Sequence, residues 1–160
     1  MALAVAGLSL AGVWLLVLAI LVAFNIGRRP TRNDAGAISH RGQLAPLDMH
    51  VGDCLELPRE LPATAMKKIT VMPCGDLHNG QVFARANVDP GPYPGTTMLR
   101  ADSLAKCKSL AATYLGKPSL LHVVAFFAAS EEAWNLGDTS QTCVLVDRQS
   151  EITGDIRAHA

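Results

Sequence analysis

Charge is absent from the start of this chain, and aromatic residues are scarce throughout it. The 160 residues include 14 basic and 14 acidic side chains, which gives a formal net charge of zero, and only 5 % are aromatic. No charged residue and no histidine lies within residues 1–27. A neutral chain lacks the basic excess expected of a nucleic-acid-binding protein. Its 49 % hydrophobic content also argues against disorder over most of its length.

Recognisable catalytic and cofactor motifs are also absent. The sequence contains no phosphate-binding loop, no dinucleotide fingerprint, no HExxH, no CxxC and no Ser-His-Asp signature. We therefore predict no catalytic residues, no cofactor and no metal site, and expect that the protein is not an enzyme.

What the first 27 residues do contain is one long apolar run. Residues 2–26 are apolar except for a few small or weakly polar side chains, and a bilayer core requires about 20 such residues in a helix. A cleaved signal peptide would need basic residues before a shorter apolar core, but the first basic residue is Arg28. The sequence predicts a single transmembrane helix over residues 1–27, in preference to a signal peptide or a buried helix.

Residues 28–47 differ in composition, being rich in Arg, Gly, Pro, Ser and Asn without an apolar period. This pattern predicts a flexible juxtamembrane linker. Its arginines follow the apolar run directly, so the positive-inside rule would place the rest of the chain in the cytoplasm.

The cysteines indicate the opposite orientation. All four (Cys54, Cys74, Cys107 and Cys143) lie in residues 48–160, and an even number in a small domain beyond an apolar helix predicts two disulfides in an oxidising compartment. Spacing leaves all three possible connectivities open. Two alternatives require free thiols: a cytoplasmic zinc-binding module using Cys74 and His78, and a thiol-dependent envelope enzyme with His78 as base.

Hydrophobic periodicity in residues 48–160 predicts an α+β domain of antiparallel strands with one main helix over residues 98–115. Cys107 lies on the apolar face of that helix, where it could link the helix to a strand, and Gly116 is expected to end it. Residues 89–95, with three prolines, predict a loop, and residues 130–137 predict a helical turn capped by Ser130. Strands are predicted over residues 68–72, 81–88, 120–128 and 141–147, with a final strand at 151–157 forming a hairpin with the one before it.

Three residues are candidates for a binding surface. His78 lies in a polar turn after Cys74, Trp134 precedes a Gly-Asp turn, and Asp138 is the acidic member of that turn. Each also has a structural explanation: a backbone hydrogen bond for the histidine, core packing for the tryptophan and a local turn bond for the aspartate.

Several motifs, taken in order, resemble the actinobacterial septum formation-related domain. They are VGDC at residues 51–54, VMPC followed by His78, QVFA at residues 81–84, the Trp134 to Cys143 segment, and ITGDI at residues 152–156. Leu77, Gln81, Thr139 and Asp155 depart from the Pro, Glu, Arg and Ser that this family usually has. The apolar run is similar to the second helix of a two-helix membrane module that often precedes this domain.

The resemblance implies a cell-membrane protein whose C-terminal domain is extracytoplasmic and associated with septum formation or the cell envelope. It implies an internal start at Met1 and a preceding helix, whose own orientation would override the arginines. We expect a non-catalytic binding module whose partners are the membrane and an unidentified division or envelope protein or cell-wall component. A hydrolytic envelope enzyme remains an alternative to this hypothesis.

Overall fold

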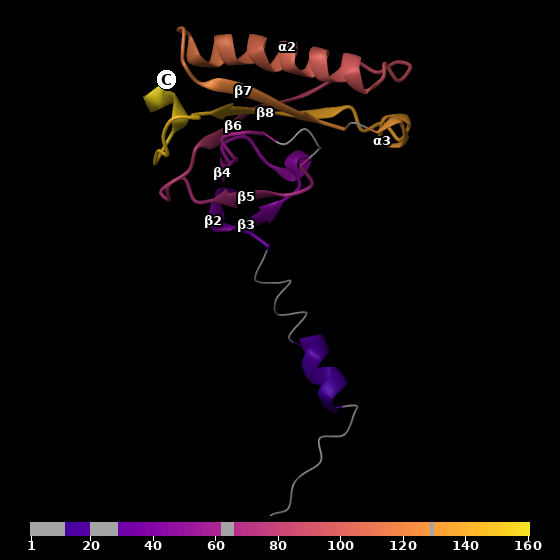
Figure 1. Ribbon diagram of the computed structural model, residues 1–160, viewed down its shortest axis with the longest axis vertical. Coiled ribbons are helices and arrows are strands. Elements are labelled where there is room, and N and C mark those ends of the chain that lie inside the picture. The colour runs from indigo at the N-terminus through magenta and orange to yellow at the C-terminus, as the bar shows by residue number, and fades with distance from the viewer. Residues whose placement is uncertain (1–11, 20–28, 62–65, 129) are drawn as a thin grey trace, which may run out of the picture.

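The computed structural model describes residues 12–19, 29–61, 66–128 and 130–160. Residues 29–160 form an α+β domain with antiparallel sheets and one main helix, as predicted (Figure 1). Its elements are β1 (Thr31–Arg32), β2 (Ile38–His40), β3 (Gly42–Leu44), η1 (Pro46–Asp48), β4 (Cys54–Glu56), β5 (Ile69–Met72), β6 (Gly80–Asn87), α2 (Thr96–Leu115), β7 (His122–Phe127), α3 (Glu131–Asn135), β8 (Ser140–Val146) and η2 (Ile156–His159).

A six-stranded sheet organises the domain, with strand order β3-β5-β4-β6-β8-β7 and antiparallel pairing throughout. The central pair joins β6 to β8, from Gly80 opposite Val146 to Asn87 opposite Ser140, with a bulge between Val82 and Ala84. Figure 1 shows α2 running along the β7 end of this sheet. The β1–β2 hairpin forms a separate two-stranded sheet.

Apolar side chains fill both faces of the sheet, because its central strands are buried on both sides. On β8, Cys143 and Leu145 belong to the core beneath α2, whereas Val144 and Val146 belong to the core on the opposite face. This separation is the alternation of successive side chains that a strand produces, and it agrees with the strand predicted over residues 141–147. The second core also contains Met49.

The main helix begins two residues before its predicted start and ends where predicted. It buries Leu99, Ser103, Cys107 and Ala111, which are spaced four residues apart and therefore share one face. Gly116 follows with φ of 66° and donates its N–H to the Ala112 carbonyl, which is a left-handed C-terminal cap. The predicted turn at residues 130–137 is α3, where the Ser130 hydroxyl accepts a hydrogen bond from the Ala133 N–H.

The structure corrects the prediction of a flexible linker at residues 28–47. Over residues 29–47 the structure instead contains the β1–β2 hairpin and β3, which pairs with β5 in the main sheet. Ile38 is 6 % exposed and packs in the core, and Pro30 crosses so close to Gly42 that a side chain there would collide with its backbone. Strands of two or three residues show no hydrophobic period, so the β3–β5 pairing has no local signal in the sequence.

The predicted hairpin between residues 141–147 and 151–157 is also absent from the structure. Ile152 forms an isolated bridge with His78 instead, and the chain ends in η2. The Asp147 carboxylate accepts hydrogen bonds from the backbone of Gln149 and Ser150, which turns the chain away from β8. Asp155 then caps η2 through the Arg157 N–H.

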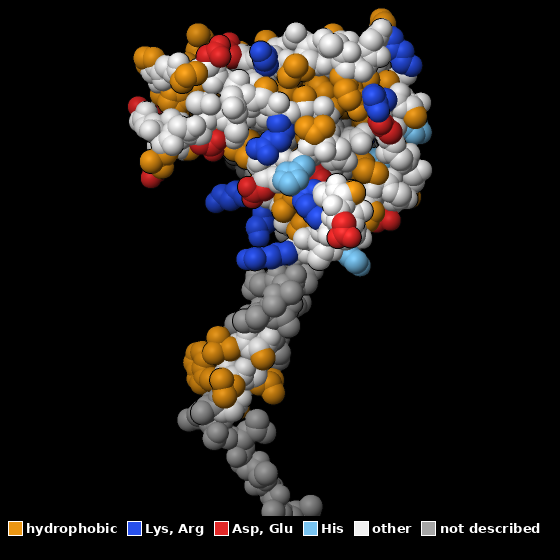
Figure 2. Space-filling model, turned by 180° about the vertical axis from the view of Figure 1, so that it is seen from behind, with side chains coloured by type: hydrophobic (Ala, Val, Ile, Leu, Met, Phe, Trp, Pro, Cys, Tyr) orange, Lys and Arg blue, Asp and Glu red, His pale blue; other side chains and the backbone are white. Residues whose placement is uncertain are grey.

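The predicted transmembrane segment lies mostly outside the described residues. Residues 12–19 are helical, and the large apolar side chains among them are between 41 % (Val17) and 69 % (Leu15) exposed. Figure 2 shows these side chains grouped on the short helix. Within the ranges that the structure describes, no helix is long and apolar enough to cross a membrane.

Candidate functional site

The four cysteines form two disulfides, Cys54–Cys74 and Cys107–Cys143, so the sequential connectivity is the one present. The first joins the start of β4 to the turn after β5, and the second joins α2 to β8 beneath the helix. Cys54, Cys107 and Cys143 are inaccessible to solvent, whereas Cys74 is half-buried. This pairing leaves Cys74 without a free thiol to act with His78.

His78 is buried and held by backbone groups. The residue is 1 % exposed, and its Nδ1 lies 2.9 Å from the Asp76 carbonyl oxygen. Because a carbonyl can only accept, Nδ1 donates the hydrogen in this bond. Nε2 has no hydrogen-bond partner in the described part of the chain. The histidine is therefore enclosed in a turn and does not face solvent.

The C-terminal segment closes over this turn. His78 donates its N–H to the Ile152 carbonyl at 3.0 Å, and Ile152 donates to the His78 carbonyl at 2.7 Å. Gly154 donates to the Cys74 carbonyl at 2.6 Å, and the Gln81 side-chain oxygen accepts from Ile156 at 2.9 Å. Residues 152–156 thereby bind the segment that contains the exposed end of the first disulfide.

Trp134 packs in the interior and fixes the loop at residues 89–95. Its residue is 6 % exposed, its Nε1 donates to the Gly91 carbonyl at 2.8 Å, and its ring meets that of Tyr93 edge-on at 6.1 Å. An open hollow of about 500 Å³ lies beside the tryptophan, and it is bordered by Asn87 to Gly91 and by residues that follow Trp134. The tryptophan forms the inner wall of this hollow and presents little of its ring to solvent.

Asp138 organises the turn into β8. Its Oδ1 accepts hydrogen bonds from the Ser140 N–H at 3.2 Å and the Ser140 hydroxyl at 2.6 Å. His78 lies two residues before β6, whereas Trp134 contacts the loop beyond the other end of β6. The structure thus brings Trp134 and Asp138 into one region but places His78 at the opposite end of the strand.

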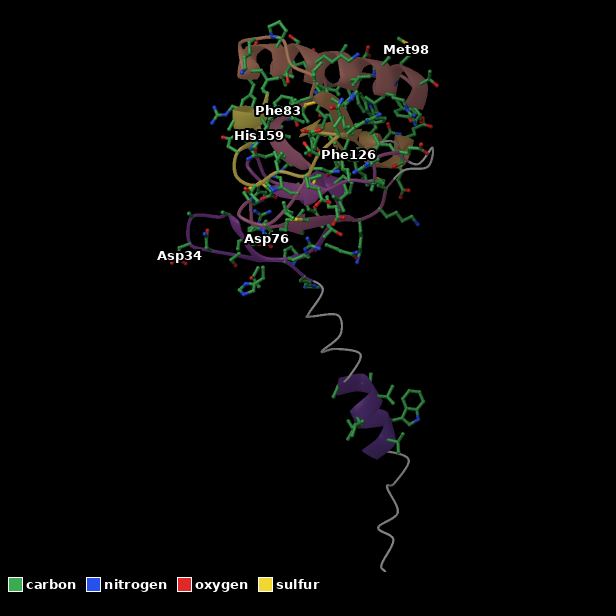
Figure 3. All side chains as sticks on the ribbon, turned by 60° about the vertical axis from the view of Figure 1, so that its left-hand side comes forward. Asp34, Asp76, Phe83, Met98, Phe126 and His159 are labelled. Carbon is green, nitrogen blue, oxygen red and sulfur yellow. A yellow bond between two sulfur atoms is a disulfide. The ribbon has the colours of Figure 1, made fainter. Side chains whose placement is uncertain are left out.

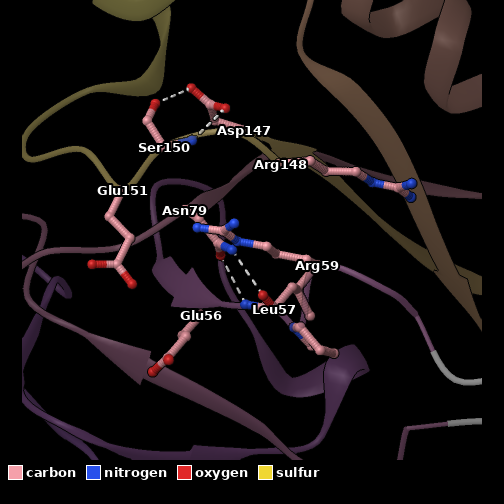
Figure 4. Close-up of a pocket in the computed structure, with 9 residues that line it drawn as sticks. Glu56, Leu57, Arg59, Asn79, Asp147, Arg148, Ser150 and Glu151 are labelled. Carbon is pink, nitrogen blue, oxygen red and sulfur yellow. Dashed lines mark hydrogen bonds between the residues drawn. The ribbon is translucent and has the colours of Figure 1, made fainter.

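A small polar cleft lies between the end of β4 and the turn after β8 (Figure 4). Its volume is about 190 Å³. Asn79 lines the cleft and is hydrogen-bonded to the backbone of Leu57. Its Oδ1 accepts from the Leu57 N–H at 2.8 Å, and its Nδ2 donates to the Leu57 carbonyl at 2.7 Å. The lining consists of Glu56, Leu57, Pro58, Arg59, Asn79, Asp147, Arg148, Ser150 and Glu151.

Both charge signs are present around this cleft. Glu56 and Glu151 supply carboxylates, and Arg59 and Arg148 supply guanidinium groups, all on exposed residues. Hydrogen bonding by Ser150 lowers the pKa of Asp147, and this carboxylate is used to hold the turn after β8. The arrangement can form ion pairs and hydrogen bonds with a polar partner. Nowhere in the described ranges do three or more His, Cys, Asp or Glu side chains gather as a metal site.

An ion pair between Arg32 and Asp53 was missed by sequence analysis. The two guanidinium nitrogens lie 2.7 Å from the two carboxylate oxygens, and the Asp53 side chain is 2 % exposed. Hydrogen bonding to Asp53 raises the pKa of Arg32. The sequence places Arg32 in the predicted linker, although the Asn33 to Gly36 turn that follows it is a hairpin signal. Figure 3 shows Asp34 of this turn at the tip of the hairpin.

No protein-family model, curated protein or solved structure matches this chain. The resemblance to the septum formation-related domain therefore stays a prediction from the motifs that carry it.

Proposed function

We propose that this chain is a membrane-anchored, non-catalytic binding module whose disulfide-containing domain lies outside the cytoplasm. The observation that carries the proposal is the use of all four cysteines in two disulfides within one small domain. Cytosolic thiols are kept reduced, whereas structural disulfides persist in secreted and envelope compartments. The pairing therefore supports an extracytoplasmic domain over the zinc-binding and thiol-dependent alternatives.

The membrane anchor in this proposal is the apolar segment at residues 1–27. It contains no charged residue, and its described part is a helix with outward-facing apolar side chains. Such side chains are costly to expose to water and suited to contact with lipid tails.

The folded domain begins much closer to this anchor than a 20-residue linker would allow. β1 starts at Thr31, only four residues beyond the apolar segment. A domain so confined stays near the bilayer, where its effective concentration toward other membrane-associated molecules is high and weak contacts suffice. We propose a division or envelope protein, or a cell-wall component, as the partner, and here the septal association rests on the motif resemblance.

Non-reducing peptide mapping of the protein from native membranes, with free thiols alkylated at lysis, tests the compartment. We expect linked peptides containing Cys54 with Cys74 and Cys107 with Cys143. The control is the same sample reduced before alkylation, which must yield four alkylated cysteines. Four alkylated cysteines in the unreduced sample would contradict the proposal and make metal analysis the next measurement.

The septal association has its own test. A fluorescent fusion expressed at native level should concentrate at the division site during septation. A fusion without residues 1–27 is the matched control and should lose this membrane enrichment. Uniform envelope fluorescence of the full chain throughout the cell cycle would contradict the septal role while leaving the compartment assignment intact.

A further inference from the structure

The open hollow beside Trp134 lies where β6 ends and β8 begins, at the end of the main sheet where Figure 1 shows α3. Part of its lining comes from the end of β6 and the loop after it, including Asn87 and Asp89. The rest comes from α3 and the turn into β8, including Asn135 and Thr139. Its volume of about 500 Å³ falls within the range of small-molecule sites, roughly 300–1,000 Å³.

Hydrogen bonds fix the backbone around the hollow. Val88 donates its N–H to the Thr139 carbonyl at 2.9 Å, which holds the two lining segments together. Gly137 donates to the Trp134 carbonyl at 2.9 Å, and the Trp134 Nε1 donates to the Gly91 carbonyl at 2.8 Å. Gly137 has φ of 87°, a left-handed conformation that glycine adopts without strain. The hollow is therefore preformed, and a ligand does not have to order it.

These same bonds use backbone groups that an extended peptide would need. Such a peptide is recognised largely through main-chain hydrogen bonds to free N–H and C=O groups. Thr139 donates its N–H to the Gly137 carbonyl at 3.1 Å and accepts from Val88, so both of its backbone groups are used. The Gly91 carbonyl is used by Trp134. Recognition in the hollow must therefore rely on side chains.

Four polar side chains around the hollow are available to a ligand, namely Asn87, Asp89, Asn135 and Thr139. Across the described ranges none of the four makes a side-chain hydrogen bond within the protein. Neighbouring polar side chains, in contrast, serve the fold, because Ser130 caps α3 and Asp138 bonds to Ser140. Three of the four residues are exposed and Thr139 is half-buried, so a ligand can reach them from solvent.

The chemistry of this lining favours an uncharged ligand that is rich in hydroxyl groups. Asparagine amides and the threonine hydroxyl both donate and accept hydrogen bonds, and each sugar hydroxyl does the same. No Lys or Arg is among the described residues that line the hollow, so an anionic ligand would meet no opposite charge. One exposed carboxylate, Asp89, contributes little to binding a cation. Trp134 adds an apolar inner wall on which the C–H face of a sugar ring can pack.

We propose that this hollow binds an uncharged saccharide unit of a cell-envelope glycan. The inference rests on the proposed function as an extracytoplasmic binding module and names a glycan as its partner class. The amides of Asn87 and Asn135 and the hydroxyl of Thr139 bond to sugar hydroxyls, and Asp89 accepts from two neighbouring hydroxyls. Because the hollow is open, a long glycan can place one part in it and continue beyond. Each single contact is weak, and repeated sugar units near a membrane-confined domain raise the effective concentration.

Residue-resolved NMR of the full chain in phosphocholine micelles tests the site, since this detergent carries no sugar headgroup. The probe is the linear tetramer of N-acetylglucosamine, which is uncharged. We expect a Kd on the order of 1 mM, with shifts confined to the Trp134 indole N–H and the amides of Asn87, Asn135 and Thr139. No saturating shift up to about 20 mM would overturn the proposal. Shifts centred on the smaller cleft beside Asn79 would also overturn it.

Two other ligands test the ligand class under the same conditions. A capped, uncharged peptide of alternating glycine and serine should cause no shift in the hollow, because the backbone groups there are already bonded. Inorganic phosphate should also cause none, because no cationic side chain among the described residues lines the hollow. Shifts by the peptide equal to those by the saccharide would overturn the proposal in favour of a peptide partner, and saturable binding of phosphate would overturn it in favour of an anion.

Substitutions of the two asparagines test whether side chains carry the binding. Asn87→Ala and Asn135→Ala each remove one amide and should weaken saccharide binding about fivefold. Gln149→Ala is the matched control, since it removes an exposed amide from the turn after β8 and should leave the Kd unchanged. Unchanged affinity in both asparagine variants would overturn the proposal.

Disulfide mapping and thermal unfolding establish that the three variants are folded, and both should match the wild type because the substituted residues are exposed. The saccharide titration uses purified protein, whereas the compartment is mapped in native membranes. Failure of saccharide binding would therefore leave the compartment assignment intact, and failure of the compartment test would leave the measured Kd intact.

Discussion

Asp53 receives three hydrogen bonds although its carboxylate is almost inaccessible to solvent: two from Arg32 and one from the His50 N–H. Similar local bonding explains other polar residues in the domain. The Asn79 side chain completes the backbone pairing of Leu57, and Asp138 and Asp147 hold turns. At the scale of single residues, these polar side chains fix the backbone, whereas the charged side chains around the cleft of Figure 4 are exposed.

Arg32→Gln should lower the free energy of unfolding by about 3 kcal/mol, because it leaves the buried Asp53 carboxylate without its charged partner. Urea unfolding measures the change. Arg41→Gln is the control, since Arg41 lies 3.8 Å from Glu56 with both side chains about half exposed, and its loss should cost less than about 1 kcal/mol. Equal effects of the two substitutions would contradict a structural role for Arg32.

The turn after β8 should make stability depend on pH. Hydrogen bonds from Ser150 lower the pKa of Asp147 below its ordinary value of 3.8, so the charged form is favoured in the folded state. This stabilisation is present above pH 3.8 and is lost as pH falls through the lowered pKa. Unfolding measured from neutral to acidic pH should show a smaller acid loss for Asp147→Asn than for the wild type. Parallel pH profiles would contradict this assignment.

At the scale of elements, the two disulfides should differ in their resistance to reduction. Both sulfur atoms of Cys107–Cys143 belong to fully buried residues beneath α2, whereas Cys74 is half-buried in a turn. Thiol exchange needs access to a sulfur atom. Limiting dithiol followed by timed alkylation and mass spectrometry should therefore show Cys54 and Cys74 labelled first. Simultaneous labelling of all four cysteines would mean that reduction follows global unfolding.

The α3 element and the loop at residues 89–95 should be coupled through Trp134. Trp134→Phe removes the hydrogen bond to the Gly91 carbonyl and should cost about 1 kcal/mol beyond the change in buried area. Hydrogen exchange should increase in the loop around Gly91 and stay unchanged in β4 and β5. An increase spread evenly over the domain would contradict a local role.

Elements with a strong local pattern could be predicted from sequence, and those built by distant pairing could not. The spacing of Cys107 and Ala111 and the position of Gly116 located α2, and alternation located β8. β3 has three residues and is defined by pairing with β5, some 27 positions further on, which no local period reveals.

The same limit applied to the candidate site. Sequence identified His78 and Trp134 as unusual residues, but their burial depends on Ile152 and Gly91, which lie far away in the chain.

At the scale of the whole molecule, the folded domain already includes residues from about 29 onward, whereas the sequence predicts its start at residue 48. A chain beginning at residue 29 should unfold thermally like the full chain, because it keeps β1, β3 and Arg32. A chain beginning at residue 48 should be markedly less stable, since it loses strand β3, buried Ile38 and the partner of Asp53. Equal melting temperatures would contradict the assignment of residues 29–47 to the domain.

The Arg32–Asp53 pair also determines how a mechanical pull on the N-terminal stem would enter the domain. Tension applied at residue 29 reaches β1 first and passes through Arg32 to Asp53, one residue before Cys54. The Cys54–Cys74 bond transfers it to the turn that Gly154 holds by its N–H. A covalent link thus joins the two places where the N-terminal and C-terminal segments attach to the domain, so force applied at residue 29 is shared with the C-terminal segment.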